Sequence, residues 1–162
     1  SGGKKVGIIS GYKDTCCAGE RTRGVLDALS DTDYEIQFTI NVTYETSITE
    51  MFMQQKPVDY LIVLETGILE EIAKILSDKQ ENGMKVYGIG SSIKCVYYLD
   101  EAVIDGLIVV DGYDMGYQSV LQISDMLKKR LHRTKDQATD YRLLHREDIF
   151  SEDTQKFLYT FY

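Results

Sequence analysis

Near its start the chain reads Lys5-Val6-Gly7-Ile8-Ile9-Ser10-Gly11. A short apolar run closed by a turn is typical of a strand buried in a sheet. Residues 17–29 follow and place apolar side chains on one side at helical spacing. The pattern predicts a strand at residues 4–10 and a helix at residues 17–29.

The same alternation of strand and helix continues along the chain. The patterns predict further strands at residues 34–40, 60–64, 85–89, 107–110 and 141–144, with helices at residues 47–55, 66–83, 94–100 and 114–131 between them. This order favours a parallel sheet with helices on both faces. We expect a three-layer α/β/α sandwich with a mostly parallel five- or six-stranded sheet.

The expected helix ends carry recognisable signals. Ser47 and Glu50 match a capping box, and Thr66 and Asp114 stand where N-caps belong. Gly83 suits a helix terminus. There is no internal repeat or Pro/Gly-rich linker, so we expect a single α/β ligand-binding lobe at residues 4–162, after a tag or linker scar at residues 1–3.

Composition narrows the function. The 162 residues carry a net charge of −8 and 43% hydrophobic residues, and no apolar run approaches the roughly 20 residues of a membrane helix. The acidic balance disfavours nucleic-acid binding, because phosphate would be repelled. No signal-peptide pattern is present, so if the natural protein is exported, we expect its signal to lie outside this chain.

Cysteines and glycines point to no metal or cofactor. Cys16, Cys17 and Cys95 have no histidine nearby, which gives no metal-ligand pattern. Glycine-rich turns complete neither the dinucleotide nor the P-loop motif. A cysteine nucleophile would need a base, and the only histidines, His132 and His145, lie late in the chain. We therefore expect no cofactor and no catalytic residue.

Ligands of such sheets bind beyond the carboxyl ends of the strands. Around that rim the sequence places the candidate ligand-binding residues Tyr12, Arg21, Tyr44, Glu65, Thr66, Ser91, Asp111 and Tyr113. Hydroxyls, carboxylates and tyrosine faces suit polyols. Loops are polar in most proteins, however, so the residues alone leave both interpretations of the rim open. For Arg21 the residues alone favour a solvated pairing with Glu20 or Asp27, and its place among the candidates depends on the resemblance described below.

Several short motifs occur in a fixed order. They are the opening strand with Arg21-Thr22-Arg23-Gly24-Val25-Leu26-Asp27-Ala28-Leu29, then Asp59-Tyr60-Leu61-Ile62-Val63-Leu64, Lys85-Val86-Tyr87-Gly88-Ile89-Gly90, Leu107-Ile108-Val109-Val110 with Asp114-Met115-Gly116-Tyr117, and Leu143-Leu144-His145-Arg146-Glu147-Asp148-Ile149. In order and spacing they resemble the carboxy-terminal lobe of type 1 periplasmic sugar-binding proteins. That family includes the effector domains of lactose-repressor-type regulators.

The resemblance implies a site with several departures. Arg21 falls on the family's sugar-contacting arginine. The usual asparagine and aspartate fall on Glu65 and Thr66, a further aspartate falls on Gly90, and another polar contact falls near Val110. Either the ligand is different, or binding by this lobe is weakened or lost.

The family has two lobes that close around the ligand, and this chain resembles the second without the first. In the family the helix that begins near Asp114 packs on the first lobe. Here we expect that helix to pack on its own sheet or on another copy, so a homo-oligomer could form through the face that the first lobe normally covers.

Four functions follow from these observations. The favoured one is a receptor for sugars or related polar solutes, outside the cytoplasm as a periplasmic or cell-surface lipoprotein, with an ABC transporter or a sensor as membrane partner. The alternative is the effector lobe of a cytoplasmic transcription regulator. A small thiol enzyme using Cys16 or Cys17, and an interaction module without a small ligand, complete the set.

Overall fold

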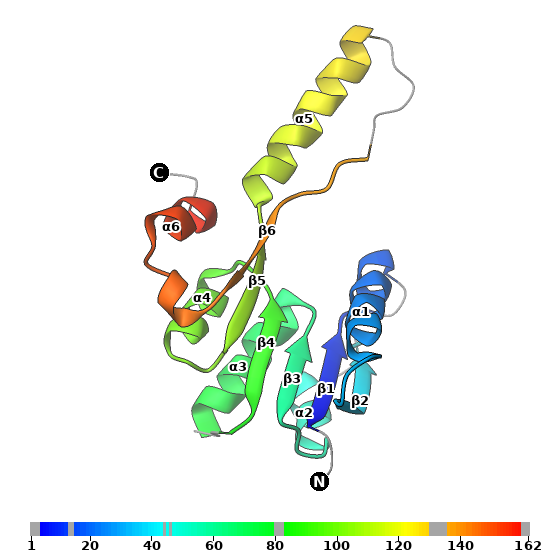
Figure 1. Cartoon of the computed structure of the whole chain (residues 1–162), viewed down its shortest axis with the longest axis vertical. Helices are drawn as coiled ribbons and strands as arrows, with labels where there is room; N and C mark the ends of the chain where they lie inside the picture. Colours follow the sequence, from blue (N-terminus) through cyan, green and yellow to red (C-terminus); the bar gives the residue numbers. More distant parts are fainter. Residues whose placement is uncertain are drawn as a thin grey trace.

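The computed structural model describes residues 4–12, 15–43, 45, 47–79, 83–129 and 136–159, except for the side chain of Lys156. Its centre is one six-stranded sheet in the order β2-β1-β3-β4-β5-β6 (Figure 1). The strands are β1 (Lys5–Ser10), β2 (Glu35–Asn41), β3 (Tyr60–Val63), β4 (Lys85–Ile89), β5 (Gly106–Val110) and β6 (Tyr141–Leu144). The first five run parallel and β6 is antiparallel to β5, which confirms the predicted fold class.

The helices connect the strands in the predicted order. They are α1 (Cys16–Leu29), α2 (Ile48–Met53), α3 (Thr66–Lys79), α4 (Ile93–Asp100), α5 (Gly112–Lys129), the 3-10 helix η1 (Arg146–Asp148) and α6 (Glu152–Leu158). The sequence pattern predicts neither η1 nor α6. No helix among the described residues combines the length and the apolar character needed to cross a membrane.

The main core lies between one face of the sheet and the helices α2, α3 and α4. Alternate residues of each strand point to this face, as the period of two requires. Leu61, Val63 and Leu107 meet Leu69 and Ile72 of α3 there, and all five are fully buried. The short apolar strands and the apolar side of α3 therefore form the main buried core.

The opposite face is only partly covered. There α1 packs Val25 and Leu29 against β1, over Val6 and Ile8. Beside α1 the face stays open as a hollow of about 610 Å³. We call it the sheet-face groove; its apolar lining includes Val25, Leu29, Ile62, Tyr87, Ile108 and Leu143.

Two predicted caps differ from the structure. The carboxylate of Asp111, not that of Asp114, caps α5, because its Oδ1 accepts a hydrogen bond from the Asp114 backbone N–H at 2.8 Å. Thr66 is the first residue of α3, and its hydroxyl donates to the Ile89 carbonyl at 3.3 Å. Ser47 does accept from the Glu50 N–H at 3.3 Å, as predicted.

Helix α5 leaves the carboxyl edge of the sheet and extends away from it (Figure 1). No residue of α5 is buried. Of the two expected positions for this helix, packing on its own sheet is therefore wrong.

Candidate functional site

The site begins with the turn that joins β1 to α1. Thr15 caps α1: its hydroxyl accepts from the Ala18 N–H at 3.3 Å and donates to the Tyr12 carbonyl at 2.9 Å. The buried hydroxyl of Ser10 donates to the Ala18 carbonyl at 3.4 Å, which ties the end of β1 to the first turn of the helix. These contacts fix where the next turn of α1, and so Arg21, lies over the edge of the sheet.

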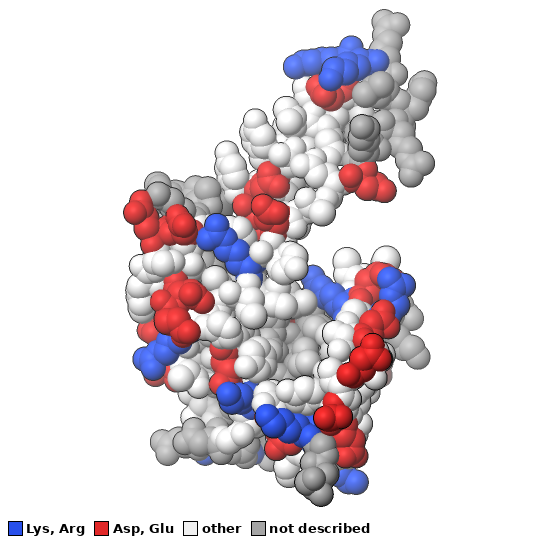
Figure 2. Space-filling model, viewed as in Figure 1, with Lys and Arg blue, Asp and Glu red and all other residues white. Residues whose placement is uncertain are grey.

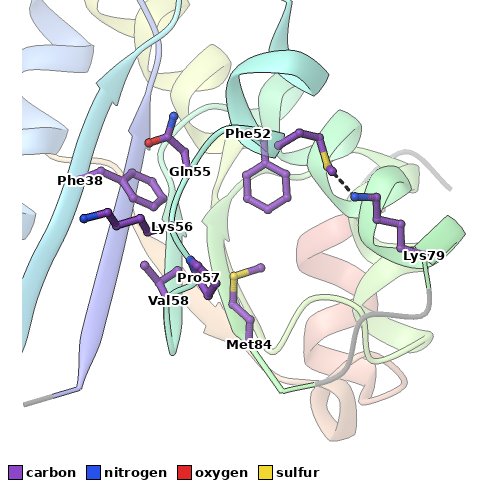
Figure 3. A pocket seen from close by; sticks show the side chains of 9 residues that line it. Phe38, Phe52, Gln55, Lys56, Pro57, Val58, Lys79 and Met84 are labelled. Carbon is purple, nitrogen blue, oxygen red and sulfur yellow. Dashed lines mark hydrogen bonds between the residues drawn. The ribbon is translucent and has the colours of Figure 1, made fainter. Parts of the chain in front are cut away.

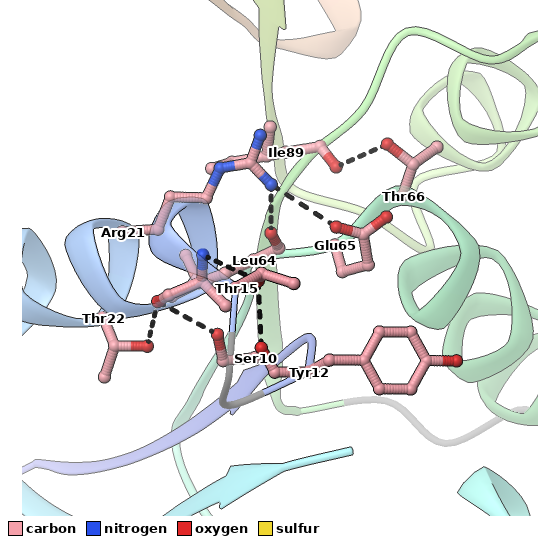
Figure 4. Close-up of polar contacts among 10 residues, drawn as sticks. Ser10, Tyr12, Thr15, Arg21, Thr22, Leu64, Glu65, Thr66 and Ile89 are labelled. Carbon is pink, nitrogen blue, oxygen red and sulfur yellow. Dashed lines mark hydrogen bonds and ion pairs between the residues drawn. The ribbon is translucent and has the colours of Figure 1, made fainter. Parts of the chain in front are cut away.

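Arg21 crosses from α1 to the end of β3 (Figure 4). Its Nη1 donates to the Leu64 carbonyl at 2.9 Å and lies 3.4 Å from Oε2 of Glu65. The side chains of Arg21 and Glu65 are 37% and 48% exposed, so the ion pair faces solvent. The remaining guanidinium N–H groups are thus presented at the edge as donors in a fixed plane.

Glu65 lies against the backbone of the first turn. A Cβ built on Gly11 would be 3.6 Å from both Cγ and Oε2 of Glu65. Tyr12 follows and is 37% exposed, and its ring extends away from Arg21 (Figure 4). The structure therefore brings three predicted residues, Tyr12, Arg21 and Glu65, to the neighbouring carboxyl ends of β1 and β3.

The adjoining position after β4 is filled. A Cβ on Gly90 would lie 3.0 Å from Sγ of Cys95 and 3.2 Å from Cγ2 of Thr66. The resemblance places a ligand-contacting aspartate at this position, but the space beside Gly90 is taken by Cys95 and Thr66. The half-buried Thr66 hydroxyl is engaged with the Ile89 carbonyl, so Thr66 contributes packing at this edge.

The other predicted residues lie farther along the edge. Ser91 is exposed after β4. The Asp111 carboxylate caps α5, and Tyr113 stacks on Tyr117 with ring centroids 6.1 Å apart. Tyr44 lies outside the described residues. The structure thus brings Tyr12 and Glu65 close to Arg21, whereas the carboxylate of Asp111 is engaged as a helix cap.

The sequence pattern does not predict a polar cluster that lies beside this edge. Ser92 caps α4 by accepting from the Cys95 N–H at 3.1 Å. Nζ of Lys94 lies 3.3 Å from Oε2 of Glu70 on α3. Hydrogen bonding from Ser92, together with Lys94, holds the pKa of the Glu70 carboxyl below its ordinary value. The Ser92 cap before a helix was the available signal, whereas the contact to α3 requires the fold.

A smaller hollow of about 200 Å³ lies at the opposite edge, near the amino ends of the strands (Figure 3). Phe38, Phe52 and Met84 line it, and the Lys79 ammonium contacts the Met53 sulfur at its margin. It is apart from the polar rim. Within the described ranges, no group of three or more metal-ligating side chains is assembled.

Several solved structures are similar to this chain in fold. A carbohydrate-transporter solute-binding protein from Agrobacterium radiobacter, in complex with D-arabinose, matches with a TM-score of 0.84 at 16% identity, over 96% of this chain and 55% of that chain. A solute-binding protein from Bacillus halodurans with bound myo-inositol gives 0.79 at 15% identity, over 96% and 55%. A LacI-type transcriptional regulator from Bacteroides fragilis gives 0.70 at 15% identity, over 91% and 54%.

The chain has the fold of a periplasmic-binding-protein lobe. It spans about half the length of these structural neighbours. No protein-family model and no curated protein sequence matches the chain. The lobe presents its polar rim at the carboxyl edge, where parallel α/β sheets bind ligands.

Proposed function

We propose that this chain is the solute-binding lobe of a bacterial receptor for sugars or related polar small molecules. The observation that carries the proposal is the placement of Arg21, held by the Leu64 carbonyl and Glu65 at the carboxyl edge. Structural neighbours of the same fold are bound to D-arabinose and myo-inositol. A planar donor group beside a carboxylate is the chemistry that polyol hydroxyls require.

We expect this lobe alone to bind its solute weakly. The rim is an open edge, the space beside Gly90 is filled, and Asp111 is used as a cap. Ordering a ligand on half of a cleft costs much of the contact free energy. We expect dissociation constants in the millimolar range for sugars, and a micromolar constant would contradict this expectation.

The proposed receptor acts outside the cytoplasm and is read by a membrane transporter or sensor when the cleft closes. Solute-binding proteins among the structural neighbours support this setting. Since the structural neighbours are solute-binding and regulator proteins, we propose that the lobe is not an enzyme.

Titration calorimetry with D-arabinose, D-tagatose and myo-inositol tests the proposal, with amino acids as the contrasting solute class. Saturable heat with at least one polyol, lost in Arg21→Lys and kept in Arg23→Lys, is the expected result. Arg23 is the matched control because it lies on the same helix and pairs with Glu20. Absence of saturable binding to every polyol, or equal binding of polyols and amino acids, would reject a polyol receptor.

A second candidate is the effector lobe of a transcription regulator, since the Bacteroides fragilis regulator has the same fold. The two candidates differ in compartment. Fractionation of cells that produce the native protein distinguishes them: recovery in the periplasmic or membrane fraction supports the receptor, and recovery in the cytoplasm supports the regulator.

A further inference from the structure

Helix α5 presents an apolar stripe to solvent. Over its 18 residues none is buried, and its apolar residues recur at helical spacing along one side. We define the α5 stripe as Tyr113, Tyr117, Val120, Leu121, Ile123 and Leu127. Val120 is 69% exposed and Leu127 is 77% exposed, which is unusual for neighbouring aliphatic side chains in a folded protein.

The polar side of α5, by contrast, faces its own chain. Nε2 of Gln122 donates to Oε1 of Gln137 at 3.2 Å, and Nε2 of Gln118 donates to the Asp114 carboxylate at 3.1 Å. The same side of the helix borders a hollow shared with Asp136. A surface helix normally turns its polar side to water and its apolar side to the protein. This reversed orientation leaves the α5 stripe to be covered by another surface.

The sheet-face groove is a surface of matching character. Its volume is about 610 Å³, and its walls are mainly aliphatic and aromatic side chains of α1 and the strands. Arg21, at the carboxyl edge, is the only charged residue among the groove-lining residues of the described chain. In Figure 2 the surface between α1 and β6 is mainly white, that is, formed by residues other than Lys, Arg, Asp and Glu. Two apolar surfaces without opposing charges can join without burying an unpaired charge.

We propose that two copies of this chain pair by exchanging α5, so that the α5 stripe of each copy docks in the sheet-face groove of the other. At 1.5 Å per residue the 18-residue helix is about 27 Å long, more than the height of the short strands it would cross. One exchange covers the stripe and the groove of both copies at once.

The exit of α5 sets the arrangement of the pair. The helix leaves from the carboxyl end of β5 and extends beyond that edge (Figure 1). A copy that receives α5 therefore lies beyond the carboxyl edge, and a two-fold axis brings the two edges face to face. The exchanged dimer would place Arg21 of one copy opposite the corresponding edge of its partner. This pairing does not depend on the solute proposed above.

Light scattering and sedimentation of the whole chain over a range of concentrations test the exchange. We expect a dimer of twice the 18.5 kDa chain mass. Val120→Asp should weaken dimerisation by about tenfold or more, because it buries a charge in an apolar contact. Ser119→Asp adds the same charge one residue away, outside the stripe, and should leave dimerisation unchanged. Circular dichroism should show both variants folded, since neither position is buried.

A second pair of variants tests the groove. Gly24 lines the groove on α1, whereas Gly19 lies on the same helix outside it, and a Cβ at either position meets nothing within 4 Å. Gly24→Arg should weaken the dimer and Gly19→Arg should not. A monomer at all concentrations, or a dimer that resists Val120→Asp or Gly24→Arg, would overturn the exchange.

Discussion

The guanidinium of Arg21 donates to the main-chain carbonyl of Leu64 at 2.9 Å. A helix side chain is thus tied to the end of a strand 43 residues later. The partner is a backbone atom, so its position depends on the sheet and not on a side-chain rotamer. Arg21 therefore reaches the edge of the sheet already oriented, which reduces the conformational entropy that a ligand must remove.

Replacing Arg21 by Lys should separate orientation from charge. Lysine keeps the positive charge but loses the planar fork of donors, so we expect polyol binding to weaken by about tenfold or more. The free energy of unfolding should change by less than about 1 kcal/mol, because the ion pair with Glu65 is exposed to solvent. Calorimetric titration and urea denaturation measure the two effects. Equal binding by Arg21→Lys and the native chain would remove Arg21 from the site.

Gly88 should tolerate no side chain. A Cβ there would lie 2.5 Å from Cδ2 of the fully buried Leu69 and 3.0 Å from the Val63 carbonyl oxygen. We expect Gly88→Ala to lower the free energy of unfolding by about 1–3 kcal/mol through overpacking. Urea denaturation measures the change.

Gly67→Ala is the matched control for that experiment. Gly67 is exposed in the first turn of α3 and its Cβ would meet nothing within 4 Å. Alanine there should leave stability unchanged or raise it by up to about 1 kcal/mol. A similar decrease in the free energy of unfolding for both alanine variants would mean that helix α3 does not pack against β4 as described.

The strand and helix order could be predicted because it depends on local periodicity. The runs at β1 and β3 are short and rich in β-branched residues, which favours strands over buried helices. Cap assignments were less secure: Asp111 and Asp114 are both good caps by residue type, and only the backbone decides that Asp111 accepts the bond. Sequence alone ranks the two equally.

The site was predictable only in part. The rule for parallel sheets places Glu65 at the edge, and the family resemblance places Arg21 there, but the contact to the Leu64 carbonyl has no side-chain signal. The hydrophobic pattern of the sequence likewise does not predict where α5 lies relative to the sheet. Periodicity predicts that Val120 and Leu127 share a side of a helix, but not which surface covers them.

Stability should depend on pH through Glu70. Ser92 and Lys94 lower the pKa of this carboxyl in the folded state, so the folded state favours the carboxylate. The resulting stabilisation is present above the ordinary glutamate pKa of about 4.3 and is lost as pH falls through the folded value. Glu70→Gln should therefore cost about 0.5 kcal/mol at neutral pH, discounted for solvent screening, and progressively less as pH falls below the ordinary glutamate value.

Denaturation of both proteins at several pH values checks this dependence. Glu71→Gln, at an exposed position of the same helix, serves as the control and should change stability less at neutral pH. A difference in stability between Glu70→Gln and the native chain that stays constant from neutral pH to the most acidic pH at which both fold would show that the carboxylate charge does not contribute.

The three cysteines should divide into two kinds by their reactivity. Cys16 and Cys17 are exposed at the start of α1, whereas Cys95 is buried against Gly90. Burial raises the pKa of the Cys95 thiol, so it stays protonated as well as inaccessible. At neutral pH we expect a chromogenic disulfide reagent to modify two thiols in the folded chain and the third only on unfolding.

The same titration tests whether either exposed cysteine is a nucleophile. A thiol activated for catalysis reacts faster than a free cysteine at neutral pH, because more of it is thiolate. With Cys16→Ser and Cys17→Ser measured separately, we expect each remaining exposed thiol to react no faster than a free cysteine thiol. A markedly faster rate at one position would instead favour a thiol enzyme over a solute receptor. Rapid modification of all three thiols in the folded chain would contradict the packing of Cys95 between α4 and the end of β4.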